Sequence, residues 1–210
     1  METYSTDEER VEALQRWWKE NKQSMFVGVV IGVGIITGWR MWQSNQLEKA
    51  QQASALYQQL VQASDAKQTD AAIKLGERML EQYPATIYGD YARLHIAKIK
   101  ADAKDLAGAR TMLEEEVAKT HDDPLKLLAR LRLGRVMLAQ NDIEPALKML
   151  EPMTGATVGK FGGLYEELRG DLLTAANRPK DARAAYAKAQ SLGNKSPVLE
   201  LKLNDLPDAN

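Results

Sequence analysis

Histidine is the first residue type to test for chemistry, because imidazole binds metal ions and transfers protons near neutral pH. The chain has two histidines, His95 and His121. His121 precedes Asp122 and Asp123, and these three side chains could together bind a metal ion. We favour another interpretation, in which Asp123 caps a helix whose first turn contains Pro124. His95 lies within an apolar helical pattern, which predicts a packed core residue.

A glycine-rich stretch at residues 155–160, GATVGK, is similar in part to a phosphate-binding loop. Its two glycines are one residue too close, and Phe161 stands where Ser or Thr should contact the metal ion. We therefore predict that this stretch connects two helices. The chain has no Cys and no serine in a G-x-S-x-G setting, which excludes cysteine nucleophiles, zinc fingers and disulfides. We expect neither an enzyme nor a bound cofactor.

The charge balance restricts the partners further. The 210 residues include 28 Lys or Arg and 29 Asp or Glu, without the basic excess of a nucleic-acid-binding protein. Five of these cations and six of these anions lie in residues 1–42, so residues 43–210 carry 23 of each. No long-range field of one sign therefore steers partners toward this larger part.

The elements that position these residues begin with an apolar segment near the N-terminus. Residues 24–39 contain no charge, and residues 25–42 would span roughly 27 Å as a helix, close to a bilayer core of about 30 Å. All four tryptophans flank this segment, as interfacial aromatics do: Trp17, Trp18, Trp39 and Trp42. We predict a transmembrane helix at residues 24–42. A buried soluble helix and a cleaved signal peptide are the alternatives, disfavoured by the glycines and by the long acidic leader.

The cations beside this segment predict its orientation. Four of them precede it and two follow it closely, which favours a cytoplasmic N-terminus; they are Arg10, Arg16, Lys19 and Lys22, then Arg40 and Lys49. Residues 1–23 would then form a cytoplasmic segment with a short amphipathic helix. Residues 43–210 would lie in the periplasm if the source is a Gram-negative bacterium.

Four glycines within the predicted transmembrane helix form two pairs, Gly28 with Gly32 and Gly34 with Gly38. Residues four apart lie on one helix face, and glycines there let another membrane helix approach closely. We predict a helix-packing role for these four residues. The alternative is that glycine is simply frequent in membrane helices.

After residue 43, apolar residues recur every three or four positions, which indicates helices. Three stretches repeat at spacings of 37 and 36 residues. Each contains a small residue, a turn residue, an alanine and a large side chain: Ala97, Lys104, Ala109 and Leu113; Gly134, Asn141, Ala146 and Leu150; Gly170, Asn177, Ala182 and Tyr186. A weaker copy precedes them around Lys67, and Pro84 ends it.

This order resembles the tetratricopeptide repeat (TPR), a helix pair in which small residues mark the closest approach of two helices. The sequence departs from that pattern in lacking the repeat tryptophan and in having a period above 34. Together with the apolar segment, this resemblance predicts an all-α protein: one N-terminal transmembrane helix followed by a TPR-like α-solenoid of about four helix pairs. The solenoid would occupy residues 43–196, and a capping helix and tail would occupy residues 197–210.

Stacked helix pairs present a concave groove lined by the first helix of each pair, a surface suited to peptides or partner helices. We predict that the function resides in this surface. The repeat register assigns nine residues to the groove: Tyr57, Val61, Leu94, Lys98, Leu131, Arg135, Leu138, Glu167 and Asp171. A register error of one residue would place some of them in the core.

The whole layout resembles a known family. The leader TDEERVEALQRWWKENKQS precedes the anchor VGVVIGVGIITGWRMWQSNQ, and AQQASALYQQL and the TPR-like pairs follow. This order is similar, over essentially the full length, to the YfgM-type ancillary subunits of the SecYEG translocon. The resemblance implies a single-pass protein of the bacterial inner membrane. It also implies partners: SecYEG, a membrane-anchored periplasmic chaperone of the prolyl-isomerase type, and nascent exported chains.

The function implied by this resemblance is that of an adaptor that passes newly exported proteins to periplasmic chaperones. A cytoplasmic regulatory role of the N-terminal segment is implied as well. The alternative is a structural scaffold that assembles a cell-envelope complex without contact to export substrates. Neither function requires a catalytic residue, a cofactor or nucleic acid, and the lipid bilayer is the remaining expected contact.

Overall fold

The computed structural model describes residues 7–151, 153 and 158–206, and it contains no strand among them. The chain divides into two compact units, Met1–Gln51 and Gln52–Asn210. One long helix, α1 (Asp7–Asp65), makes up the described part of the first unit and continues into the second. The predicted all-α class is confirmed.

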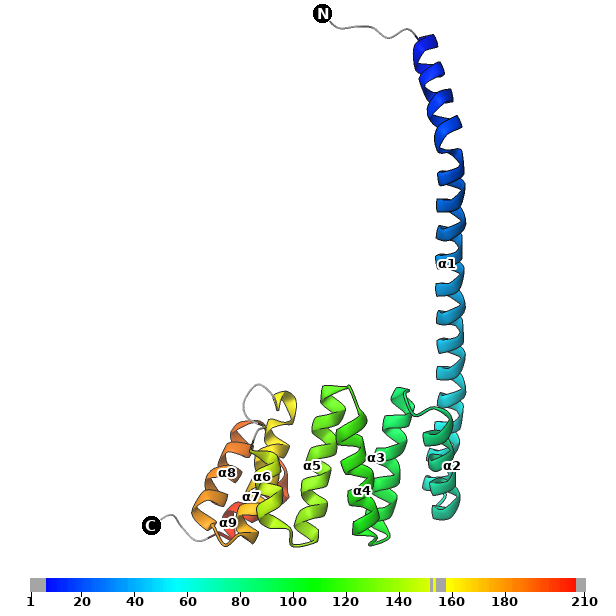
Figure 1. The fold of residues 1–210 in the computed structure, drawn as a ribbon. Helices are drawn as coiled ribbons and strands as arrows, with labels where there is room; N and C mark the ends of the chain where they lie inside the picture. Colours follow the sequence, from blue (N-terminus) through cyan, green and yellow to red (C-terminus); the bar gives the residue numbers. More distant parts are fainter. Residues whose placement is uncertain (1–6, 152, 154–157, 207–210) are drawn as a thin grey trace, which may run out of the picture. The chain divides into compact units, whose positions relative to one another are not determined.

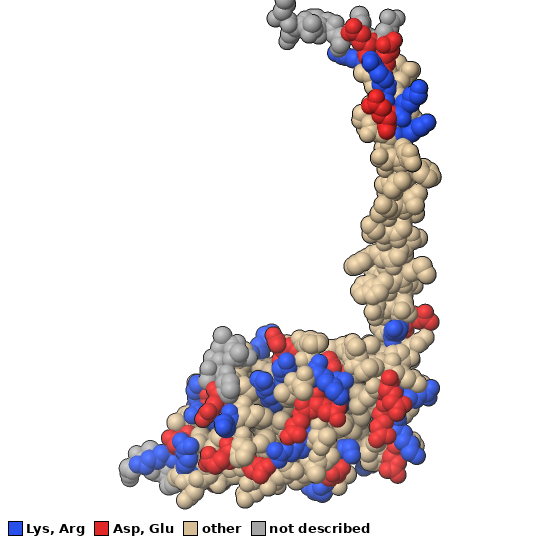
Figure 2. Space-filling view, viewed as in Figure 1, with Lys and Arg blue, Asp and Glu red and all other residues tan. Residues whose placement is uncertain are grey.

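The first unit contains the predicted membrane segment. Within α1, one window is long and apolar enough to cross a membrane, and none of it is buried. Figure 2 shows this part of the helix as a band without charged side chains. A continuous helix pairs its own backbone polar groups, which is the condition for entering lipid. No break separates residues 7–22 from the apolar segment, so the predicted amphipathic helix is the beginning of α1.

The second unit is a stack of helix pairs (Figure 1). Residues 52–65 of α1 form the first pair with α2 (Thr69–Gln82), and α3 (Ile87–Asp102) pairs with α4 (Leu106–Lys119). The next pairs are α5 (Asp123–Ala139) with α6 (Ile143–Leu150), and α7 (Gly162–Ala175) with α8 (Pro179–Ser191). The last helix, α9 (Pro197–Asn204), packs against α8. The described residues therefore contain the four helix pairs that the repeats predict.

The turns inside the four pairs close in the same way. Each has one residue of positive φ, between 57° and 66°, and these are the predicted turn residues Lys67, Lys104, Asn141 and Asn177. The next amide donates to a carbonyl five residues earlier, as Asp105 N does to Lys100 O at 2.8 Å. This bond ends a helix in the Schellman motif. Lysine adopts this conformation less readily than asparagine, so helix packing must stabilise two of the turns.

Small residues lie where the two helices of a pair approach most closely. Three alanines at equivalent repeat positions are fully buried: Ala109, Ala146 and Ala182. A methyl group on Gly170 would lie 2.3 Å from Cε1 of Tyr186. The Tyr186 hydroxyl donates to Asp171 at 2.8 Å, which holds the ring in place. The repeat pattern therefore identified positions where packing requires a small side chain.

The connection after α6 contains the glycine-rich stretch. α6 ends at Leu150, and the next residue, Glu151, keeps a helical backbone and donates its amide to the Leu147 carbonyl at 3.1 Å. Residues 154–157, which include the first half of the predicted connection, lie outside the described residues. The described end of this stretch enters a short 3-10 helix, η2 (Gly159–Phe161), which leads into α7.

The start of α5 corrects one prediction. The capping residue is Asp122 and not Asp123, because Oδ1 of Asp122 accepts a hydrogen bond from the Leu125 amide at 2.8 Å. Both aspartates can cap a helix, and the extended backbone of Asp122 decides between them. Pro124 lies in the first turn, as predicted. Over the described part of the chain, no group of His, Asp and Glu residues could hold a metal ion.

Candidate functional site

The first helices of the first two pairs bring four rings together. Tyr57 comes from α1, and Tyr88, Tyr91 and His95 come from α3. The centroid of the Tyr57 ring lies 5.9 Å from that of Tyr88, 5.8 Å from that of Tyr91 and 6.3 Å from that of His95. These are favourable separations for tilted and edge-to-face rings. We refer to these four residues as the aromatic cluster.

The aromatic cluster borders the first of two adjoining hollows. Tyr57, Tyr91 and His95 line a hollow of about 190 Å³, together with Leu94, Lys98, Leu125, Leu128 and Arg132. A second hollow, of about 380 Å³, shares Lys98 and Arg132 with the first and is lined by Ala97, Ala101, Asp102, Leu113, Arg135 and Val136. We call the two hollows together the cationic groove.

Three cations and one carboxylate line the cationic groove. Nζ of Lys98 lies 2.8 Å from Oδ2 of Asp102. Nη1 of Arg132 donates to the carbonyl oxygen of Leu94 at 3.4 Å, and within the described residues neither Arg132 nor Arg135 forms an ion pair. Burial lowers the pKa of Arg132, and the positive charge of Arg135 lowers it further. An anion in the groove would relieve this excess of positive charge.

His95 is not the core residue that the sequence predicts. It is half-buried, and it lines the first hollow of the cationic groove. Its Nε2 is buried and has no hydrogen-bond partner among the described residues. Burial lowers the pKa of His95, and the nearby Lys98 lowers it further, so the imidazole is neutral at neutral pH. His95 therefore adds a neutral ring to the groove and no charge.

The fourth pair carries an acidic site on α7. Nζ of Lys202, from α9, lies 2.8 Å from carboxylate oxygens of both Glu167 and Asp171. Nδ2 of Asn194 donates to Glu167 at 2.8 Å. Burial acts to raise the pKa of Glu167, but the hydrogen bonds from Lys202 and Asn194 outweigh it and lower the pKa. We call these four residues the acidic clamp, in which the chain itself supplies the partner of each carboxylate.

The nine predicted groove residues therefore fall into separate places. Four of them line the cationic groove: Tyr57, Leu94, Lys98 and Arg135. Glu167 and Asp171 belong to the acidic clamp and are bound by Lys202. The predicted groove is thus one surface only over the first three pairs.

The other three predicted residues pack against the core. Val61 and Leu138 are half-buried beside apolar clusters. Leu131 is 2% exposed and offers a ligand no surface, which corrects its assignment to the groove. The reason is that α5 packs against α3, α4, α6 and α7, so little of its circumference stays open.

Five residues that line the first hollow are absent from the predicted groove: Tyr91, His95, Leu125, Leu128 and Arg132. His95 and Arg132 are 37 residues apart, and so are Tyr91 and Leu128, so the same repeat positions line the groove in both pairs. A register shifted by one residue, from Leu131 to Arg132, would have found the third cation of the groove.

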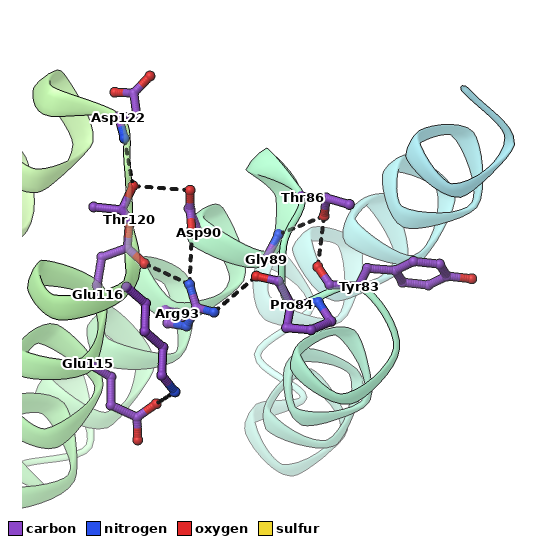
Figure 3. Close-up of polar contacts among 11 residues, drawn as sticks. Tyr83, Pro84, Thr86, Gly89, Asp90, Arg93, Glu115, Glu116, Thr120 and Asp122 are labelled. Atoms are coloured by element: carbon purple, nitrogen blue, oxygen red, sulfur yellow. Dashed lines mark hydrogen bonds and ion pairs between the residues drawn. The ribbon is translucent and has the colours of Figure 1, made fainter. Parts of the chain in front are cut away.

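A buried ion pair holds α3 against α4 (Figure 3). Nη1 of Arg93 lies 3.1 Å from Oε2 of Glu116 and 2.8 Å from Oδ1 of Asp90. Nη2 of Arg93 donates to the carbonyl oxygen of Pro84 at 3.1 Å. The side chains of Arg93 and Glu116 are 4% and 0% exposed. Because both terminal nitrogens already bind oxygens of the chain, Arg93 positions helices and does not serve as a ligand site.

The four glycines of α1 lie in open space. A Cβ atom added to any of them would meet no other atom within 4 Å, as judged for Gly28, Gly32, Gly34 and Gly38. Their surface is therefore available to another helix. Their role in helix packing stays a prediction.

Comparison with known proteins identifies the family. Residues 15–208 match the family described as a tetratricopeptide repeat-like domain. The ancillary SecYEG translocon subunit of Escherichia coli K12 is 32% identical over 209 residues, which cover 98% of this chain and 99% of that protein. The chain belongs to the family of ancillary SecYEG translocon subunits.

Other ancillary SecYEG translocon subunits are similar over the same extent. That of Haemophilus influenzae is 30% identical over 207 residues, covering 97% of this chain and 99% of the relative. That of Neisseria gonorrhoeae is 24% identical over 213 residues, covering 98% and 100%. The likeness therefore includes both the apolar segment of α1 and the helix pairs.

Proposed function

We propose that this chain is a membrane-anchored adaptor of the SecYEG translocon that passes newly exported proteins to periplasmic chaperones. The observation that carries this proposal is the near full-length similarity to ancillary SecYEG translocon subunits. It is supported by the candidate membrane span in α1 and by the open groove on the helix pairs.

The mechanism is recruitment. The apolar part of α1 anchors the chain beside the translocon, and the flanking cations favour a cytoplasmic N-terminus with the helix pairs in the periplasm. Anchoring raises the effective concentration of the groove for chains that leave the translocon. A membrane-anchored chaperone of the prolyl-isomerase type and nascent exported chains are the partners of the helix pairs. The segment before the membrane acts as a regulatory element in the cytosol.

Recognition and not catalysis is the basis of this function. The cationic groove combines rings, an apolar floor and charges, which are the elements of a protein-binding surface. An adaptor needs a surface of this kind and no reactive group. We therefore assign no enzymatic activity to the chain.

Affinity purification in mild detergent tests the role of the anchor. The full chain and a chain lacking residues 1–43 are compared for the proteins that co-purify with them. We expect SecYEG with the full chain and its loss from the shortened chain, because the membrane helix brings the partners together. Retention of SecYEG by the shortened chain would assign recruitment to the helix pairs, and its absence from both would contradict the proposal.

Site-specific photocrosslinking tests the hand-off. A crosslinking amino acid at Lys98 or Arg135 should capture a periplasmic chaperone or a nascent chain. The same amino acid at Glu77, an exposed residue of α2, is the control. Capture of a stable envelope complex from the groove, without any nascent chain, would favour the alternative function of a structural scaffold.

A further inference from the structure

We propose that the cationic groove binds a segment of a partner protein in which a large apolar side chain adjoins one or more carboxylates. This inference rests on the proposed adaptor function and specifies the chemistry of its ligand. Three features of the groove support it: its rings and apolar floor, its excess of cations, and the contrast with the acidic clamp.

The apolar part of the ligand is inferred from the first hollow. Tyr91 is 36% exposed, and its ring is held by contacts with the rings of Tyr57 and Tyr88. Leu94 is 5% exposed and lines the hollow together with Leu125 and Leu128. Rings that are already ordered lose little conformational entropy when a large side chain packs against them. The first hollow is therefore suited to an aromatic or large aliphatic side chain.

The charged part of the ligand is inferred from the second hollow and its border. Arg132 lines both hollows, and Arg135 lines the second. Lys98 pairs with Asp102, whereas the two arginines form no ion pair with any residue that the structure describes. A planar guanidinium binds a carboxylate through two parallel hydrogen bonds. A basic segment would be repelled by the same two arginines, and a neutral one would leave their charges unbalanced.

The acidic clamp shows the complementary arrangement within the same chain. Asp171 stands 36 residues after Arg135, at the equivalent position of the next pair. There the carboxylate receives a cation, Lys202, from the following helix. At Arg135 the sign is reversed: no described residue forms an ion pair with it, and Glu167, whose pKa the charge of Arg135 helps to lower, is already bound by Lys202 and Asn194. A partner segment that supplies carboxylates would fill this place.

Peptide binding to the full chain in nanodiscs of neutral lipid tests the inference. The probe is a fluorescein-labelled peptide of ten residues with two Phe and four Asp or Glu, followed by fluorescence anisotropy. In a second peptide Lys replaces each acidic residue, and in a third Ser replaces each Phe. We expect the first peptide to bind most tightly, with an affinity that falls as the salt concentration rises.

Variants of the groove locate the binding. Arg132→Gln and Arg135→Gln should each weaken binding of the first peptide about tenfold, because each removes one charged partner. Arg130→Gln is the matched control, since Arg130 lies on the same helix and lines neither hollow. Tyr91→Ala should weaken binding of the Phe peptide and leave the Ser peptide unaffected. Circular dichroism and thermal unfolding confirm that each variant is folded.

Two results would overturn the inference. One is equal or tighter binding of the basic peptide, and the other is a response of Arg132→Gln that matches Arg130→Gln. Co-purification with SecYEG separates this inference from the proposed function. A chain that retains SecYEG but does not prefer the acidic peptide contradicts the inference alone, and a chain that binds the peptide but never SecYEG contradicts the function alone.

Discussion

The cationic groove and the acidic clamp occupy equivalent positions in successive helix pairs, yet they carry opposite charge. Lys98, Arg135 and Asp171 follow one another at the repeat spacing of 37 and 36 residues. Lys98 and Arg135 border open hollows, whereas Asp171 is bound by Lys202 of α9. The same helix geometry thus leaves one region open and closes the other.

The difference follows from the place of each pair in the stack. A terminal pair has no following neighbour to cover it, and a solenoid therefore needs a cap with a polar outer face. Leu199 of α9 is 1% exposed and packs against α8, while Lys202 binds the two carboxylates of α7. Each pair before the fourth is followed by another helix pair, so no capping helix covers the groove on these pairs. The open region is available to a partner for this reason.

Breaking the buried ion pair between α3 and α4 should have the largest effect. Arg93→Met leaves Glu116 buried without its cation, and we expect the free energy of unfolding to fall by about 3–5 kcal/mol. Urea unfolding followed by circular dichroism measures it. Lys119→Met is the control, because it removes an exposed pair with Glu115 and should cost less than about 1 kcal/mol.

A double variant separates the charge from the packing. Arg93→Met combined with Glu116→Met removes both buried charges and should recover much of the loss. If the double variant is no more stable than Arg93→Met alone, the unpaired carboxylate is not the source of the destabilisation.

Removing the cation of the acidic clamp should have a smaller effect. Lys202→Met keeps an apolar stem but leaves Glu167 and Asp171 without their shared partner, which we expect to cost about 1–2 kcal/mol. Thermal unfolding measures the loss, with Lys195→Met, an exposed lysine just before α9, as the control. Peptide binding in the cationic groove should not change. Equal stability of Lys202→Met and Lys195→Met would show that α9 is held by its apolar contacts alone.

The fold could be predicted from the sequence because it repeats. The spacing of 37 and 36 residues identified turn residues such as Asn141, and close-packed positions such as Gly170, before any contact was known. Such a pattern records which positions are small, large or turn-forming. It therefore fixes the order and pairing of the helices.

The candidate site could be predicted only in part, because the same pattern does not fix how far each helix is rotated against its neighbours. Leu131 was assigned to the groove in place of Arg132, which is a rotation of one residue. The bond from Lys202 to Glu167 joins residues 35 apart on two different helices, and no local spacing indicates it. Charges at the ends of long side chains are placed by tertiary contacts and not by periodicity.

The smallest effect is the response to pH of two carboxylates, Glu116 in the ion pair between α3 and α4 and Glu167 in the acidic clamp. Burial raises the pKa of Glu116 above its ordinary value of 4.5, although the hydrogen bond from Arg93 opposes this. The stability that Glu116 contributes is therefore present below pH 4.5 and is lost as the pH rises through its raised pKa. The pKa of Glu167 is lowered, so its contribution is present above pH 4.5 and is lost as the pH falls through its lowered pKa.

Free energies of unfolding measured below and above pH 4.5 should show opposite pH dependences for the two carboxylates. The advantage of the wild type over Glu116→Gln should shrink as the pH rises, and its advantage over Glu167→Gln should shrink as the pH falls. Glu77→Gln, on the exposed surface of α2, is the control for a change of charge alone. The difference in unfolding free energy between wild type and variant could instead change with pH in the same direction for both variants. Arg93 would then stabilise the buried carboxylate as fully as Lys202 stabilises the half-buried one. The two carboxylates would then differ in exposure and not in how their charges are balanced.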